Sequence, residues 1–295
     1  MWAMPTLNLW PEQPVIQNDQ IEVSFTREDA SGERQRAWYR CSAEHQPALS
    51  ASCDPYVLAA LFIAMQQKAD LVVHGQVSPS LLKNLCEYQA AWFCWQPKRY
   101  AAVEISAETE QESERKPARK ALTSFSGGLD SAFSAWRHVS GQAGRQTVSL
   151  QAGLMLHGFD IRLNQPEIFA RAAVKSQRML ESLGLKLVTM ASNLKKTGAR
   201  FEDAHAAQIA SCMMLLQGGY DSGLIASSYP YYDMLFPWGS NPLTDRMLSS
   251  SAFSIIQDGT AFNRLEKIQA IAAWPEAIQD LRVCVHGEER DENCC

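Results

Sequence analysis

The chain has 295 residues, of which 46% are hydrophobic and 20% are charged, and its formal net charge at pH 7 is −5. These values are typical of a soluble globular protein large enough for two domains. The acidic balance argues against general nucleic-acid binding, and no apolar run reaches the length of a membrane span. The N-terminal stretch lacks the basic and apolar regions of a signal peptide. We therefore expect a cytoplasmic protein whose eight cysteines are mostly reduced.

The first 115 residues predict a β-rich α+β unit with no catalytic constellation. Residues 1–20 show no periodicity, which predicts an irregular arm. Alternating and helical apolar patterns then follow one another. The predicted elements are a hairpin over 21–26 and 35–41, helices over 54–67 and 79–95, and strands over 70–75 and 100–106.

A charged, apolar-poor run separates this unit from the rest of the chain. It carries glutamates over 108–114 and then basic residues over 115–120, and it is interrupted by Pro117. Such a composition is typical of a solvated linker. We therefore predict one domain over residues 1–115 and a second over residues 116–295.

The second half alternates strands with helices, which predicts an α/β fold with a parallel, doubly wound sheet. The predicted strands cover 121–125, 147–157, 185–191, 222–227 and 251–257, and the predicted helices cover 131–139, 165–183, 200–217 and 263–273. In such sheets, ligands bind beyond the carboxyl ends of the strands. Residues that follow each strand are therefore site candidates.

The segment Ser124–Ser131 reads Ser-Phe-Ser-Gly-Gly-Leu-Asp-Ser and lies between the first of these strands and a helix. A glycine turn at a helix N-terminus presents backbone N–H groups to an anion such as phosphate. Gly127 and Gly128 permit close approach and positive φ. The hydroxyls of Ser126 and Ser131 add donors, and Asp130 is suited to hold a divalent ion.

The string Ser-Gly-Gly-x-Asp-Ser at residues 126–131 resembles the PP-loop of the N-type ATP pyrophosphatases, and the chain looks nearest to the 7-cyano-7-deazaguanine synthase group. The resemblance spans roughly residues 118–295. It implies an adenine nucleotide alpha hydrolase-like fold and cleavage of ATP between the α and β phosphates. A substrate oxygen would be adenylated, and a nitrogen or sulfur nucleophile would then displace AMP. The resemblance implies that ATP and Mg²⁺ are held by Ser126, Gly127, Gly128, Leu129, Asp130 and Ser131.

Further candidates follow the other predicted strands. His157 and Asp160 either contact nucleotide or substrate or belong to a plain loop with a helix cap. Glu202 and His205 share a helix face, which fits a metal pair, acid–base work or a solvated surface. Ser227 leaves the fourth strand, where the resemblance places nucleotide-facing residues.

Two later segments supply the remaining candidates. Asn241, Asp245 and Arg246 lie in a long loop, which predicts a functional segment, and we expect them to recognise the substrate. Arg264 and Lys267 open the last long helix. The resemblance implies a basic residue here that neutralises phosphate charge, but spacing does not choose between the two, and a surface salt-bridged pair is the competing account.

The C-terminal segment carries Cys284, Cys294 and Cys295. It resembles the four-cysteine zinc site of the 7-cyano-7-deazaguanine synthase group. Cys284 and Cys294 match the first two ligands, Cys295 stands where that motif has glycine, and the sequence stops before the other two. Since tetrahedral zinc needs four donors, we expect an incomplete site that binds Zn²⁺ poorly.

These observations predict an ATP-dependent ligase or amidotransferase that adenylates a small-molecule carboxylate or carbonyl oxygen. Ammonia, an amine or a sulfur donor would come from outside, and a homodimer is one assembly that this prediction allows. The alternatives are a tRNA-thiolation enzyme, or a degenerate nucleotide-binding protein that regulates without chemistry.

Overall fold

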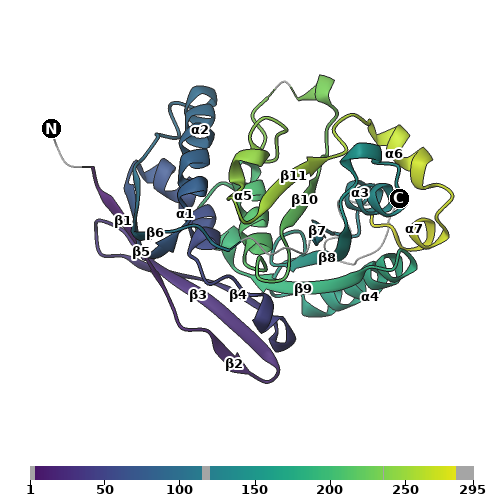
Figure 1. The fold of residues 1–295 in the computed structure, drawn as a ribbon, viewed down its shortest axis with the longest axis horizontal. Coiled ribbons are helices and arrows are strands. Elements are labelled where there is room, and N and C mark those ends of the chain that lie inside the picture. Colours follow the sequence, from purple (N-terminus) through teal and green to yellow (C-terminus); the bar gives the residue numbers. More distant parts are fainter. Residues whose placement is uncertain (1–3, 115–119, 235, 284–295) are drawn as a thin grey trace.

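The structure is a computed structural model that describes residues 4–114, 120–234 and 236–283. It is an α/β fold built on one 11-stranded mixed sheet, mostly parallel, with an antiparallel region near the N-terminus (Figure 1). The strands are β1 (Thr6–Pro11), β2 (Val15–Gln17), β3 (Gln20–Glu28), β4 (Arg34–Ser42), β5 (Asp70–Val77), β6 (Ile105–Glu110), β7 (Ala121–Ser124), β8 (Leu150–His157), β9 (Lys186–Ser192), β10 (Ser222–Ala226) and β11 (Ser254–Asp258). The helices are α1 (Asp54–Gln67), α2 (Pro79–Trp95), α3 (Leu129–Val139), α4 (Pro166–Ser182), α5 (Phe201–Met214), α6 (Arg264–Ile271) and α7 (Pro275–Asp280).

The C-terminal half of the sheet is parallel, with the order β11-β10-β7-β8-β9. The chain leaves β7 toward β8 and β9 on one side, and later adds β10 and β11 on the other. The carboxyl end of β7 is therefore the point at which the strand order reverses. This is the position at which open α/β sheets bind ligands.

The N-terminal half adds strands to the same sheet. β3 and β4 form the predicted antiparallel hairpin, and β4 pairs antiparallel with β9 at Tyr39 and Ser192, so the sheet runs without interruption from β11 to β6. The doubly wound parallel sheet that we predicted is thus part of a larger mixed one. The predicted boundary at residue 115 falls where the described part of the chain is interrupted, and the division at that residue stays a prediction.

The irregular arm predicted for residues 1–20 is wrong. β1 lies between β3 and β5, antiparallel to the former and parallel to the latter, and β2 pairs with β3. Leu7 and Leu9 of β1 are fully buried. Thr6-Leu7-Asn8-Leu9 alternates polar and apolar residues, which is the short pattern of a half-buried strand, and the two leucines are its buried positions.

Two hydrophobic cores cover the two faces of the parallel strands. Adjacent residues along a strand enter different cores, as alternation requires: Leu122 and Ile225 join the core of α1, α2 and α5, whereas Ala121 and Leu224 join the core of α3, α4, α6 and α7. Figure 1 shows α1 and α2 over the N-terminal strands and α4 alongside β9. Helices on both faces hold the carboxyl end of β7 in a rigid frame.

Across the described residues, every helix is too short or too polar to cross a membrane.

Candidate functional site

The loop between β7 and α3 is the centre of the site. Gly127 has a φ of +76°, and Gly128 is the N-cap residue of α3. The loop is stabilised from within, because the Gly128 N–H donates to Ser126 Oγ at 3.3 Å and Ser131 Oγ donates to the Gly128 carbonyl at 3.0 Å. The two serine hydroxyls lie 3.5 Å apart. The loop is therefore pre-shaped at a helix N-terminus, where the positive end of the helix dipole favours an anion.

Close packing restricts both glycines, but only Gly127 has a positive φ, because Gly128 has an extended backbone with a φ of −84°. A Cβ atom on Gly127 would lie 3.0 Å from Ser176 Oγ of α4 and 3.3 Å from Arg282 Cδ. A Cβ atom on Gly128 would lie 3.2 Å from Ser126 Oγ. A side chain at either position would displace the neighbours that hold the loop.

Lys267 reaches the loop from α6, which packs against α3 in the same hydrophobic core. Its Nζ donates to Asp130 Oδ1 at 2.7 Å and also to the carbonyl oxygen of Ser227. The lysine side chain is 2% exposed and that of Asp130 is 25% exposed. A buried ammonium is retained only with such partners, so the pair ties the start of α3 to the end of β10.

The capping of α6 explains why Lys267, and not Arg264, makes this contact. Asn263 and Glu266 form a capping box at the helix N-terminus, which fixes where the helix begins. Arg264 then stands in the first turn with an exposed side chain, whereas Lys267 is buried one turn later. Sequence spacing left both residues open, and the structure brings only Lys267 to Asp130.

A cavity of about 660 Å³ opens beside the loop. Its floor and walls come from the ends of β7, β8 and β10, from α5 and from the segment after α7. Its lining includes the polar groups of Ser126, Gly128, Asp130 and Ser131 and the apolar side chains of Leu154, Met155, Leu156, Phe159, Ile161, Phe201, Ile209, Ile225 and Trp238. A polar end beside a mostly apolar wall is typical of sites for small organic ligands.

His205 lies on the wall of this cavity together with Glu202 and Asp160. Its Nδ1 lies 3.2 Å from the Glu202 carbonyl oxygen and 3.3 Å from that of Phe201. Because carbonyl oxygens only accept, Nδ1 carries the proton in the neutral ring. Burial lowers the pKa of His205, against the opposing effect of these carbonyls. The ring is therefore neutral at pH 7, and its Nε2 is left as a hydrogen-bond acceptor.

Of the residues that follow the strands, the structure brings Asp160 to the cavity but not His157. The His157 ring stacks on Phe169 with centroids 4.4 Å apart and donates from Nε2 to the Arg162 carbonyl at 2.9 Å. Burial lowers the pKa of His157. Ser227 is buried and contributes through its backbone carbonyl to Lys267, while its hydroxyl donates to the Tyr229 carbonyl.

The lining of this cavity does not include the three residues expected to recognise a substrate, of which two make contacts within their own loop and the third lines a different hollow. Asp245 is fully buried and accepts hydrogen bonds from Ser240 Oγ at 2.6 Å and from the Asn241 N–H at 2.8 Å. Asn241 in turn accepts from the Leu243 N–H. Both side chains brace their own loop. Arg246 is exposed and lines a separate hollow of about 400 Å³ with Asn84 and Met247.

The described cysteines lie away from the cavity. Burial raises the pKa of Cys41 and Cys53 to about 11 and that of Cys212 further still, so these thiols stay protonated and unreactive. Cys86 and Cys94 are exposed on α2. Cys284, Cys294 and Cys295 lie outside the described residues. Within the described residues, His, Cys, Asp and Glu side chains form no group of three placed for a metal ion.

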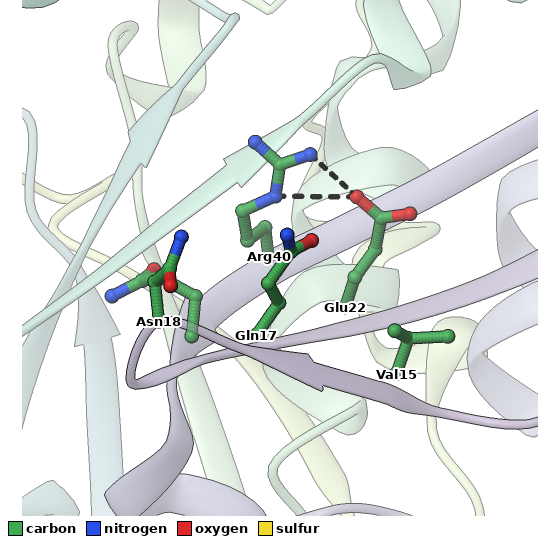
Figure 2. Close-up of a pocket in the computed structure, with 6 residues that line it drawn as sticks. Val15, Gln17, Asn18, Glu22 and Arg40 are labelled. Atoms are coloured by element: carbon green, nitrogen blue, oxygen red, sulfur yellow. Dashed lines mark hydrogen bonds and ion pairs between the residues drawn. The ribbon is translucent and has the colours of Figure 1, made fainter.

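A further hollow, of about 320 Å³, lies on the hairpin of β2 and β3. Figure 2 shows Arg40 reaching over it to Glu22, with which it forms hydrogen bonds of 2.6 and 3.2 Å. The same guanidinium lies over the ring of Trp38 at 4.9 Å. Its charge is thus balanced, and the hollow offers a ligand no concentrated charge.

Two features of the cavity were not found from sequence. One is Arg282, which lines the cavity beside the loop. The sequence around this arginine, after the last helix, has no pattern that predicts a binding residue. The aromatic wall of Phe159, Phe201 and Trp238 comes from three separate segments, which only the fold brings together. The site as a whole can bind an anionic group at α3 and an apolar body beside it. No family model, curated protein or solved structure matches this chain.

Proposed function

We propose that the protein binds ATP at the loop Ser126–Ser131 and adenylates a carboxylate or carbonyl oxygen of a small molecule, as the PP-loop ATP pyrophosphatases do. The motif at these residues resembles that of the superfamily. The observation that carries the proposal is its setting: the loop caps α3 at the strand-order reversal and opens on a 660 Å³ cavity with a polar and an apolar part. Such a cavity has room for a nucleotide and part of a second substrate.

Each residue of the loop would make a different contact with the nucleotide. The Gly128 N–H and the Ser131 hydroxyl would exchange their contacts within the loop for phosphate oxygens, to which the Ser126 hydroxyl would also donate. Asp130 keeps a quarter of its side chain exposed in the cavity, so a carboxylate oxygen can reach a Mg²⁺ ion that bridges the phosphates. Lys267 would hold Asp130 in place and offset negative charge beneath the loop.

The proposed chemistry has two steps. An acceptor oxygen attacks the α-phosphorus, an oxygen–phosphorus bond forms, and the bond to the bridging oxygen breaks with release of pyrophosphate. An amine nitrogen then attacks the activated carbon, the carbon–oxygen bond breaks, and AMP leaves with its electron pair while the nitrogen loses a proton. Neutral His205, whose Nε2 accepts, is suited to take that proton.

Nitrogen is favoured over sulfur as the nucleophile by the placement of the thiols. None of the five described cysteines lines the cavity, and the buried ones have raised pKa values. An enzyme that carried the sulfur on a cysteine of its own would need a reactive thiolate near the adenylated atom. We therefore rank the amidotransferase chemistry above tRNA thiolation.

The test is ATP binding and ATP turnover in the wild type and in Asp130→Asn, with Mg²⁺ and a panel of carboxylates. We expect wild-type turnover in the presence of a suitable acceptor. In Asp130→Asn turnover should fall at least about 100-fold, while ATP affinity falls about tenfold, because the metal acts mainly in the transition state. Asp19→Asn is the matched control: Asp19 is exposed, has a φ of +58° and lies in the hairpin far from the loop.

The outcomes separate the proposal from its alternatives. Binding without turnover by any acceptor would favour a degenerate nucleotide-binding protein. Absence of ATP binding would exclude both.

A further inference from the structure

Arg282 contacts the loop through both its backbone and its side chain. The Arg282 N–H donates to the Gly127 carbonyl at 2.8 Å, and the residue forms a parallel bridge with Gly128. Its guanidinium Nη1 donates to the Ser126 carbonyl at 2.8 Å. The segment after α7 therefore fastens onto the loop more than 150 residues away in sequence.

The stem of Arg282 packs where glycine leaves room. A Cβ atom on Gly127 would lie 3.3 Å from Arg282 Cδ and 3.6 Å from Arg282 Cγ. The Arg282 side chain can therefore pack in this position only because residue 127 is glycine, since a larger residue there would displace it. The guanidinium donates to the Ser126 carbonyl of the loop, and Arg282 lines the cavity together with Ser126, Gly128, Asp130 and Ser131.

The charges around the cavity make this placement significant. In the described part of the chain, Arg282 is the only arginine or lysine among the lining residues, and it stands with three carboxylates, Asp130, Asp160 and Glu202. Lys267 lies behind Asp130, buried and paired with it. A triphosphate brought to this site needs cationic partners, and a guanidinium with several donors is well suited to phosphate oxygens.

We propose that Arg282 is the phosphate-binding arginine of the site: it holds the loop in position through Ser126 and Gly127 and supplies the guanidinium that contacts the triphosphate. The inference rests on the proposed binding of ATP. It adds a residue beyond the loop motif and makes the segment after α7 part of the nucleotide site.

The test compares Arg282→Gln and Arg282→Lys with the wild type, using equilibrium affinities for ATP and adenosine. Glutamine removes the charge but keeps an N–H donor, whereas lysine keeps the charge. We expect Arg282→Gln to lower the ratio of ATP affinity to adenosine affinity about tenfold, as loss of a charged hydrogen bond does, and Arg282→Lys to restore part of it. Arg145→Gln, at an exposed arginine of the turn 144–146, is the matched control.

Each result decides between clear alternatives. An unchanged ratio with lower affinity for both ligands would show that Arg282 only braces the loop and would overturn its role in phosphate binding. Wild-type affinities in Arg282→Gln would overturn both parts of the inference. If the wild type itself binds no ATP, the proposed function fails first, and the inference fails with it.

Discussion

The Nζ atom of Lys267 lies 2.7 Å from Asp130 Oδ1, although the two residues are 137 positions apart in sequence. The contact joins α6, which follows the edge strand β11, to the first turn of α3, which follows the inner strand β7. It also connects both helices to β10 through the Ser227 carbonyl. The position of the Asp130 carboxylate, on which the proposed metal binding depends, is therefore set by the packing of the last long helix.

Replacing Lys267 by methionine should lower the free energy of unfolding by about 2 kcal/mol. The change leaves Asp130 and the Ser227 carbonyl without their cation, and the loss is reduced from that of a fully buried pair because Asp130 is partly exposed. Urea unfolding measures it.

Arg264→Met, on the exposed face of the same helix, is the matched control and should change stability by less than about 0.5 kcal/mol. In the double variant Lys267→Met/Asp130→Asn part of the loss should be regained. Equal effects of the Lys267 and Arg264 variants would contradict the importance of the pair.

Replacing Gly127 by alanine should weaken ATP binding as well as the fold. Its positive φ strains any larger residue, and its Cβ would in addition meet Ser176 Oγ and Arg282 Cδ. Gly141 separates these two effects, because it has a similar φ of +73° but nothing within 4 Å of a Cβ. We expect Gly141→Ala to cost about 1 kcal/mol of stability and to leave ATP affinity unchanged.

Gly127→Ala should cost about 1–2 kcal/mol more than this control and lower ATP affinity. Unfolding curves and ATP titrations of the two variants give the comparison. If the two glycine variants behaved alike, close packing at Gly127 would not matter to the site.

Stability should depend on pH through Asp245. Burial raises the pKa of this carboxyl to about 7 from its ordinary value of 3.8, against the hydrogen bonds from Ser240 and Asn241. The folded protein then binds a proton more tightly than the unfolded chain between these two pH values. Folding stability attributable to Asp245 is therefore present below pH 3.8 and is lost as pH rises to about 7, by up to about 4 kcal/mol.

Asp245→Asn tests this dependence, since asparagine keeps the shape without the ionisation. The difference in unfolding free energy between the wild type and the variant should change with pH from 4 to 7 and then level off above 7. A difference that stays constant over that range would show that the carboxyl does not titrate there.

The second half of the chain was the more predictable part. Its alternating strands and helices were placed within a few residues of β7 to β11 and α3 to α6, because each buried strand there is a local apolar run. The glycine loop also lies where predicted. The order of the strands was not predictable, since pairing of β10 with β7 is a contact between distant segments.

The N-terminal half shows where local patterns fail. β1 alternates only over the four residues 6–9 and is ordered by partners on both sides. β2 is exposed on all three residues and carries no alternating signal. The glutamates of the acidic run are exposed, as expected, but the run is not irregular throughout: β6 includes its start, and Glu112 accepts hydrogen bonds from Ser80 at 2.7 and 2.8 Å. Composition reports charge but not the donors that meet it.

The sequence predicted the loop of the candidate site but not the residues that surround the loop. Spacing could not decide between Arg264 and Lys267, because residues three positions apart lie on the same side of a helix. Only the position at which the helix begins shows which of the two is buried. Asn241 and Asp245 look like binding residues in sequence, but their side-chain oxygens accept hydrogen bonds from within the loop. Arg282 could not be found at all, since its only distinguishing feature is contact with a loop far away in the chain.

The most direct test of the central claim follows the α-phosphate of ATP. Protein, Mg²⁺, an amine donor and a panel of carboxylates are incubated with ATP labelled at the α-phosphate, and the products are separated. The account predicts label in AMP, release of unlabelled pyrophosphate, and loss of both products in Asp130→Asn. Label in ADP, with release of inorganic phosphate, would contradict it.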